Sequence, residues 1–125
     1  MSIAGDLAAF LVKTKVGDLP PLALERARMA IASTIASAAM GADIVSSRII
    51  RELATERGGS PEATVWFDGG RRLPVADTSR VNAVMGDAAA SDDSDLRSIA
   101  HIGTIVSTTA IVMGEGTGAG GRVVL

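Results

Sequence analysis

The sequence predicts an all-α fold, a helical bundle with one short β-hairpin at about residues 63–74. Hydrophobic residues make up 47% of the 125-residue chain, but aromatic residues make up only 2%. The core must therefore consist mainly of Ala, Ile, Leu, Val and Met, which suits closely packed helices better than a β-sandwich. Apolar residues also recur at helical spacing along most of the chain, and the length fits one domain or a piece of one.

The first two helices are predicted at about residues 2–14 and 21–40. In the first, the apolar residues at helical spacing are Ile3, Leu7, Phe10 and Leu11. Pro21 starts the second, because proline is tolerated in a first helical turn. Ala and Ser occupy both sides of this helix, so we expect it to be buried nearly all round. Gly41 is expected to act as its C-cap.

A third helix is expected to open at Asp43 or at the serines near residue 46 and to end near Arg57. Four aliphatic residues are predicted to form its buried face: Ile44, Ile49, Ile50 and Leu53. Four charged residues are predicted to point to water: Arg48, Arg51, Glu52 and Glu56.

The hairpin follows a helix-breaking segment, Gly58–Pro61. Ala63–Phe67 is predicted to form a short strand, Asp68–Gly70 its turn and Arg71–Pro74 the return strand. A fourth helix is then expected at about residues 75–89, with Val81, Val84 and Met85 in the core.

The C-terminal part combines a polar, acidic stretch at residues 91–98 with a last apolar helix at about 101–114. Gly116–Gly121 formally matches the G-x-G-x-x-G pattern of dinucleotide-binding loops. Such a loop needs a strand before it, whereas the preceding run is predicted to be helical. We therefore expect a helix terminator and a loop between helices.

The charge pattern and the cysteine count exclude several classes of function. The net charge is −2 and the ten arginines are scattered, which argues against nucleic acid as a partner. Without cysteine there is no disulfide, thiol nucleophile or Cys-based metal site, which fits a cytoplasmic protein. The longest uncharged runs, 29–42 and 102–114, are too short to span a bilayer, so a soluble protein is expected.

Candidate catalytic residues gather near the acidic stretch. His101 is the only histidine, and histidine readily exchanges protons near neutral pH. Asp92 and Asp93 could orient it, while Ser94 or Arg97 could hold a substrate carboxylate. In the alternative interpretation, Asp93, Ser94 or Asp95 caps a helix, Arg97 is solvated and His101 lies in a first helical turn.

A metal site is not expected. Asp92, Asp93 and Asp95 crowd together, and hard cations prefer oxygen ligands. However, the sequence has no Asp-x-Asp-x-Asp-Gly loop and no second acidic motif.

Several segments, in order and spacing, resemble the N-terminal helical part of the MmgE/PrpD family, the 2-methylcitrate dehydratase-like enzymes. They are Asp18–Pro21 with Glu25–Ala27, Gly58–Trp66, Arg72–Pro74, Arg80–Ala83, Asp92–Ser94 and His101–Gly103. The resemblance implies a large helical domain and a smaller α+β domain, with the active site between them. It also implies action on small polycarboxylates by dehydration, decarboxylation or epimerisation, mostly without a cofactor, and a homodimer.

Carried over by position, Asp92 and Asp93 match the family's paired aspartates. Ser94 stands where threonine is usual, and His101 matches the downstream histidine. The resemblance thus implies that these four residues belong to the active site, whereas Arg97 is a candidate on its chemistry alone.

Three positions depart from the family pattern. Ala90 and Ser91 replace an earlier Asp and Phe, and Asp87 stands where many members have a histidine. The loss of an acidic group favours a branch of the family with a different substrate.

We therefore expect residues 1–125 to be a partial N-terminal helical domain of a lyase or isomerase that abstracts a proton next to a carboxylate. The second α+β domain is absent from these residues, so the chain alone is expected to be inactive. The alternative is a non-catalytic helical module that self-associates through uncovered apolar faces.

Overall fold

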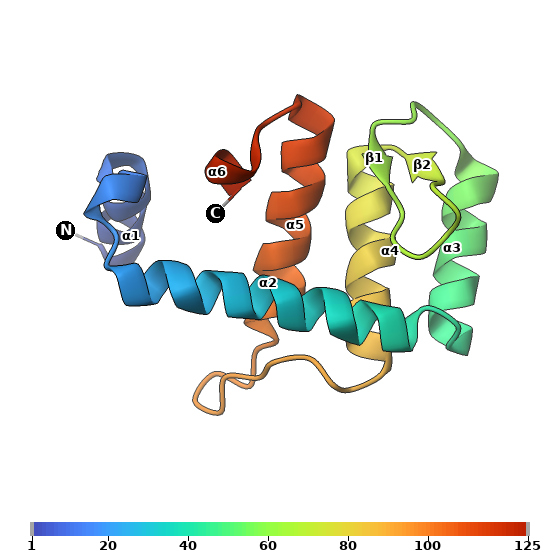
Figure 1. The fold of residues 1–125 in the computed structure, drawn as a ribbon, viewed down its shortest axis with the longest axis horizontal. Helices are drawn as coiled ribbons and strands as arrows, with labels where there is room; N and C mark the ends of the chain where they lie inside the picture. Colours follow the sequence, from blue (N-terminus) through green and yellow to red (C-terminus); the bar gives the residue numbers. More distant parts are fainter. Residues whose placement is uncertain (1, 125) are drawn as a thin grey trace.

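The computed structural model describes residues 2–124 and confirms an all-α fold with one small hairpin (Figure 1). The chain forms, in order, α1 (Ile3–Lys13), the 3-10 turn η1 (Val16–Asp18), α2 (Pro21–Gly41), α3 (Val45–Arg57), β1 (Ala63–Thr64), β2 (Arg72–Leu73), α4 (Val75–Ala88), α5 (Ile102–Thr117) and α6 (Gly121–Val124). The predicted helices all lie within a few residues of their expected bounds.

The long helix α2 crosses the molecule; α4 and α5 pack against it, and α3 packs against α4 (Figure 1). The hairpin packs at one end of α4 and α5. The loop that joins these two helices lies at their other end (Figure 1). α1 stands apart from the rest at the N-terminal end of α2.

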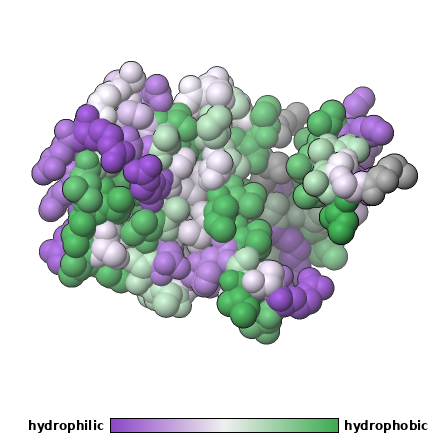
Figure 2. Space-filling view, turned by 180° about the vertical axis from the view of Figure 1, so that it is seen from behind, coloured by the Kyte–Doolittle hydropathy of each residue, from purple (hydrophilic) through white to green (hydrophobic). Residues whose placement is uncertain are grey.

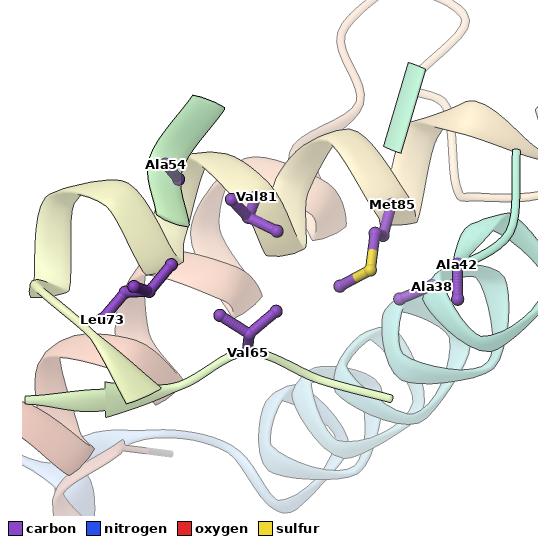
Figure 3. Packing of buried hydrophobic residues seen from close by; sticks show 7 residues of the cluster. All are labelled: Ala38, Ala42, Ala54, Val65, Leu73, Val81 and Met85. Atoms are coloured by element: carbon purple, nitrogen blue, oxygen red, sulfur yellow. The ribbon is translucent and has the colours of Figure 1, made fainter. Parts of the chain in front are cut away.

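The hydrophobic core lies where α2, α3, α4 and the hairpin meet (Figure 3). Its residues are of the aliphatic types and methionine that the composition predicts: Ala38, Ala42, Ala54, Val65, Leu73, Val81 and Met85. Gly41 is not the predicted C-cap, because Ala42 takes that place. A Cβ on Gly41 would overlap the backbone oxygen of Met85, so this glycine lets α4 approach α2 closely.

The prediction that α2 is buried nearly all round is wrong. Its buried residues lie in the C-terminal half and are Thr34, Ser37, Ala38 and Gly41. α4 and α5 cover this half on one side, while its other side and most of the N-terminal half stay accessible to solvent. An Ala- and Ser-rich surface fits against a neighbouring helix, but it does not determine how many neighbours are present.

The start and the buried face of α3 also differ from the prediction. Ile44 is the N-cap residue, and no side chain caps this end. Ser47 and Ala54 are the buried residues and Ile50 packs beside the core, whereas Ile49 and Leu53 are 52% exposed. α3 therefore turns mainly small residues and Ile50 toward the core, and it leaves Ile49 and Leu53 outside.

Arg51 does not point to water as predicted. Its side chain is 15% exposed, Nη2 donates to the Ala42 carbonyl at 3.4 Å and Nη1 lies 3.8 Å from Asp68 Oδ1. Arg51 thereby links α3 to the end of α2 and to the hairpin turn.

The hairpin is shorter than predicted. β1 and β2 pair antiparallel, with Ala63 opposite Leu73. Beyond Thr64 one more backbone bond joins the two arms, from the Val65 N–H to the Arg71 carbonyl at 2.8 Å. The buried amide of Asn82 also accepts from the Trp66 N–H at 3.0 Å and donates to the Thr64 carbonyl at 3.1 Å. A side chain of α4 thus takes the place of a longer strand ladder.

α5 ends as predicted, at a glycine. Gly118 adopts a left-handed conformation with φ +67°, and its N–H bonds back to the end of the helix. α6 follows, so the glycine-rich segment joins two helices. Among the described residues, no single helix has both the length and the apolar character needed to cross a membrane. Only α2 and α3 taken together reach that length and apolar character, and they are bent by 92° relative to each other.

Candidate active site

The candidate residues lie on the loop between α4 and α5 and on the first turn of α5. At the start of this loop the chain reverses at Ala90, which has the left-handed φ of +49°. Ser37 of α2 holds the next residue in place: its hydroxyl donates to the Gly86 carbonyl at 2.6 Å and so accepts from Ser91 Oγ at 2.8 Å. The acidic residues that follow are thereby placed against the N-terminal end of α5.

Asp92 and His101 form the predicted pair. His101 Nδ1 lies 2.9 Å from Asp92 Oδ2, and the Asp92 side chain is 1% exposed while that of His101 is 45% exposed. A carboxylate only accepts, so Nδ1 carries the proton and Nε2 remains available. Thr104 Oγ1 donates to the same carboxylate oxygen at 2.7 Å.

Asp93 caps the N-terminal end of α5. Its two carboxylate oxygens lie 2.9 and 3.1 Å from the N–H of Gly103, which belongs to the first turn of the helix. This geometry satisfies a helix-end N–H and places negative charge at the positive end of the helix dipole. A Cβ on Gly103 would overlap Asp93 Oδ1, so the glycine makes room for the carboxylate. Asp93 thus has the helix-capping role that the alternative interpretation gives it.

Ser94 and Arg97 lie on the exposed part of the loop. The Arg97 side chain is 93% exposed, and its Nε lies 3.5 Å from Asp95 Oδ1. In the described chain, neither Ser94 nor Arg97 is hydrogen-bonded to the Asp92–His101 pair. The Asp95 carboxylate accepts hydrogen bonds from Ser98 Oγ and from the Arg97 N–H within the same loop. These bonds, that from Ser98 first, lower the pKa of the Asp95 carboxyl.

Asp87, on the last turn of α4, also reaches the pair. Asp87, Asp92 and His101 each offer one ligand atom, and these three atoms all lie within 4.8 Å of one another. Two carboxylates and an imidazole are a ligand set that a divalent transition-metal ion accepts. This grouping differs from the Asp92, Asp93 and Asp95 cluster seen in the sequence.

Sequence reasoning named Asp87 only as a departure from the family pattern and did not name Thr104. The helical period gave a signal for Thr104, which follows His101 by three residues and therefore shares its face. For Asp87 the signal was its position one residue before the end of α4, next to the acidic loop.

These observations define a class of protein: a helical domain that sets a buried aspartate against a half-exposed histidine at the start of a helix. A family model described as the MmgE/PrpD N-terminal domain matches residues 5–125. The chain belongs to the MmgE/PrpD family. No curated protein and no solved structure matches it significantly.

Proposed function

We propose that this chain supplies the acid–base part of an active site for a lyase or isomerase acting on a small di- or tricarboxylate. The observation that carries the proposal is the buried Asp92 carboxylate on Nδ1 of His101. Membership of the MmgE/PrpD family supports the substrate class. The reaction would begin with removal of a proton from the carbon next to a substrate carboxylate.

Asp92 sets the chemistry of His101. By accepting the Nδ1 proton it keeps the lone pair on Nε2, where a substrate C–H can meet it. When Nε2 takes the proton, the adjacent carboxylate stabilises the resulting imidazolium, as in the His–Asp pairs of hydrolases. Thr104 holds the carboxylate in place through a second hydrogen bond.

Arg97 and Ser94 would bind the substrate's carboxylates. Arg97 extends into solvent with a single exposed contact to Asp95, and a guanidinium can hold a carboxylate through two parallel hydrogen bonds. The same positive charge would stabilise the negative charge that develops after proton removal.

The test uses the protein as its source organism produces it, with a panel of polycarboxylates that includes 2-methylcitrate, cis-aconitate and iminodisuccinate. His101→Gln should reduce turnover by at least about a hundredfold, since general acid–base groups contribute that much or more. His101 is half-exposed and its side chain makes no helix-cap bond, so folding should be unchanged. Circular dichroism and thermal unfolding check this, and unchanged turnover in a folded variant would exclude His101 as the acid–base group.

Metal removal tests whether the reaction is cofactor-free, as we propose. EDTA treatment should leave turnover unchanged, because Asp92 and His101 suffice for proton transfer. If EDTA abolishes turnover and Zn²⁺ or Mn²⁺ restores it, the Asp87, Asp92 and His101 group is a metal site. Asp87→Asn would then weaken the restoration.

A second candidate is the non-catalytic helical module. The observation that favours it is the number of large apolar side chains left exposed on α1, α3 and α5. Thermal unfolding of the 125-residue chain with the same panel separates the two. We expect no turnover from these residues alone, but a bound polycarboxylate should raise the Tm of an enzyme domain and leave that of a module unchanged.

A further inference from the structure

Two carboxylates at the start of α5, those of Asp92 and Asp93, are engaged inside the protein. Asp92 accepts from His101 and from Thr104, and its side chain is only 1% exposed. Both oxygens of Asp93 face the N–H of Gly103. Burial closes off Asp92 and the helix end occupies Asp93, so neither carboxylate is placed to bind a substrate.

Asp87 differs from both. Its side chain is exposed, and its carboxylate accepts no hydrogen bond from residues 2–124. One of its oxygens nevertheless lies within 4.8 Å of a carboxylate oxygen of Asp92 and of a ring nitrogen of His101. A substrate that reaches the acid–base pair therefore lies beside the carboxylate of Asp87.

The backbone at the end of α4 holds Asp87 in this place. The Ser37 hydroxyl donates to the Gly86 carbonyl at 2.6 Å, which ties the last turn of α4 to α2. The Ala90 N–H donates to the Asp87 carbonyl at 2.9 Å, so the chain turns soon after this residue. The loop that follows projects from the lower edge of the molecule, with hydrophilic and hydrophobic side chains on its surface (Figure 2). Asp87 thus stands at the base of that loop, on the body of the protein.

The charge of Asp87 restricts which substrate group can lie next to it. A carboxylate only accepts hydrogen bonds, and it repels a second carboxylate at short range. The carboxylates of a substrate are therefore directed away from Asp87 and toward a cation such as Arg97. The group that meets Asp87 must be a donor. Because the Asp92 carboxylate lies close by, a positively charged donor is favoured over a neutral hydroxyl.

We propose that Asp87 determines substrate specificity. It selects a small di- or tricarboxylate that carries a positively charged amino group on or next to the carbon that His101 deprotonates. This inference rests on the proposed function, because it takes His101 as the base and Arg97 as the carboxylate-binding group. Asp87 and Arg97 then recognise opposite charges of one zwitterionic substrate.

Three dicarboxylates that differ in one substituent test the proposal: succinate carries a hydrogen, malate a hydroxyl and aspartate an ammonium group. Isothermal titration calorimetry, on the protein as its source organism produces it, gives a Kd for each. Aspartate should bind at least about tenfold more tightly than succinate, with malate between them. Asp87→Asn keeps the size and an acceptor oxygen but removes the charge. The preference for aspartate should then fall to about threefold or less, while succinate binds no more weakly than before.

Asp6→Asn is the matched control, since it removes the same charge from an exposed position on α1 and should leave the preference unchanged. Circular dichroism shows whether each variant is folded. A structural role of Asp87 would weaken all three ligands alike, so an unchanged preference in Asp87→Asn would overturn the proposal.

A wild type that binds succinate as tightly as aspartate would overturn the specificity proposal alone and leave the proposed function standing. Failure of all three dicarboxylates to bind would also overturn it. If the wider polycarboxylate panel does not bind either, the proposed function fails as well.

Discussion

Two threonines one turn apart on α5 show how a single hydroxyl can serve function or only occupy space. Thr104 is 5% exposed and donates to the carboxylate of Asp92 at 2.7 Å. Thr108 is 1% exposed, and its hydroxyl has no hydrogen-bond partner among residues 2–124. Thr104 therefore contributes a polar interaction, whereas the buried, unpaired hydroxyl of Thr108 costs free energy.

Thr104→Val should lower kcat about tenfold or more, since partners that orient a catalytic group contribute on this scale. The side chain touches Asp92 and not the substrate, so the pH profile of kcat should shift while KM changes little. Thr104→Ser restores the hydroxyl and should restore both. Thr108→Val is the matched control; it should leave turnover unchanged and keep or raise the free energy of unfolding by about 1 kcal/mol. Equal loss of turnover in both variants would assign Thr104 a packing role only.

At the residue scale, the Asp92–His101 pair was predictable and its surroundings were not. The sequence places both residues in one polar segment before an apolar helix, which brings them close to the same helix end. Whether Asp93 turns to the histidine or to the helix depends on the space beside Gly103. The sequence shows the glycine that leaves this space, but the approach of the loop to it depends on tertiary packing, which a linear pattern does not contain.

The helices and the hairpin are tied together at both ends of α5. Near its C-terminal end, Glu115 accepts from the Thr64 N–H at 2.8 Å and from the Thr64 hydroxyl, and it lies 3.6 Å from Arg72. Burial raises the pKa of Glu115, but the two hydrogen bonds and Arg72 together outweigh it, so the pKa is lowered. This carboxylate therefore attaches the hairpin to α5 in its charged form.

Glu115→Gln should lower the free energy of unfolding by roughly 1 kcal/mol at pH 7. A lowered folded-state pKa gives stability that is present above the unfolded-state value of about 4.5 and lost as the pH falls through the folded-state value. The difference between the variant and the wild type should thus shrink below pH 4.5. Urea unfolding at a series of pH values measures it, with the exposed Glu56→Gln as control. A difference that is constant with pH would show that the charge of Glu115 is not involved.

At the element scale, helix bounds were easier to predict than helix faces. Pro21, Gly58 and Gly118 mark ends through backbone chemistry that acts locally. Ile49 and Ile50 are chemically identical, yet only Ile50 packs beside the core. Which of the two isoleucines is buried depends on the position of α4. That position depends on small residues far away in the sequence, such as Gly41.

The whole molecule is held together by a small core. Three of its seven clustered residues are alanines, and Met85 of α4, fully buried and pointing toward Ala38 and Ala42, is one of the few large ones (Figure 3). Small residues let helices approach closely, but each buries little apolar area. Global stability therefore depends strongly on the few large side chains.

Met85→Ala should lower the free energy of unfolding by about 2–5 kcal/mol, because a buried methionine leaves a cavity that close-packed helices cannot fill. Urea unfolding at one fixed protein concentration measures the change. Met29→Ala is the control, since Met29 is 53% exposed, and it should stay within about 0.5 kcal/mol. A small loss for Met85→Ala would mean that the core collapses around the gap.

α5 begins directly after His101 of the acid–base pair and carries the hairpin attachment, Glu115, near its other end. With 16 residues it is a rod about 24 Å long, clamped by the carboxylates of Asp93 and Glu115. A rod held in this way moves as one body. A tilt of this rod near Glu115 would therefore displace His101 relative to a substrate, which links the seating of the hairpin to the alignment of the acid–base pair.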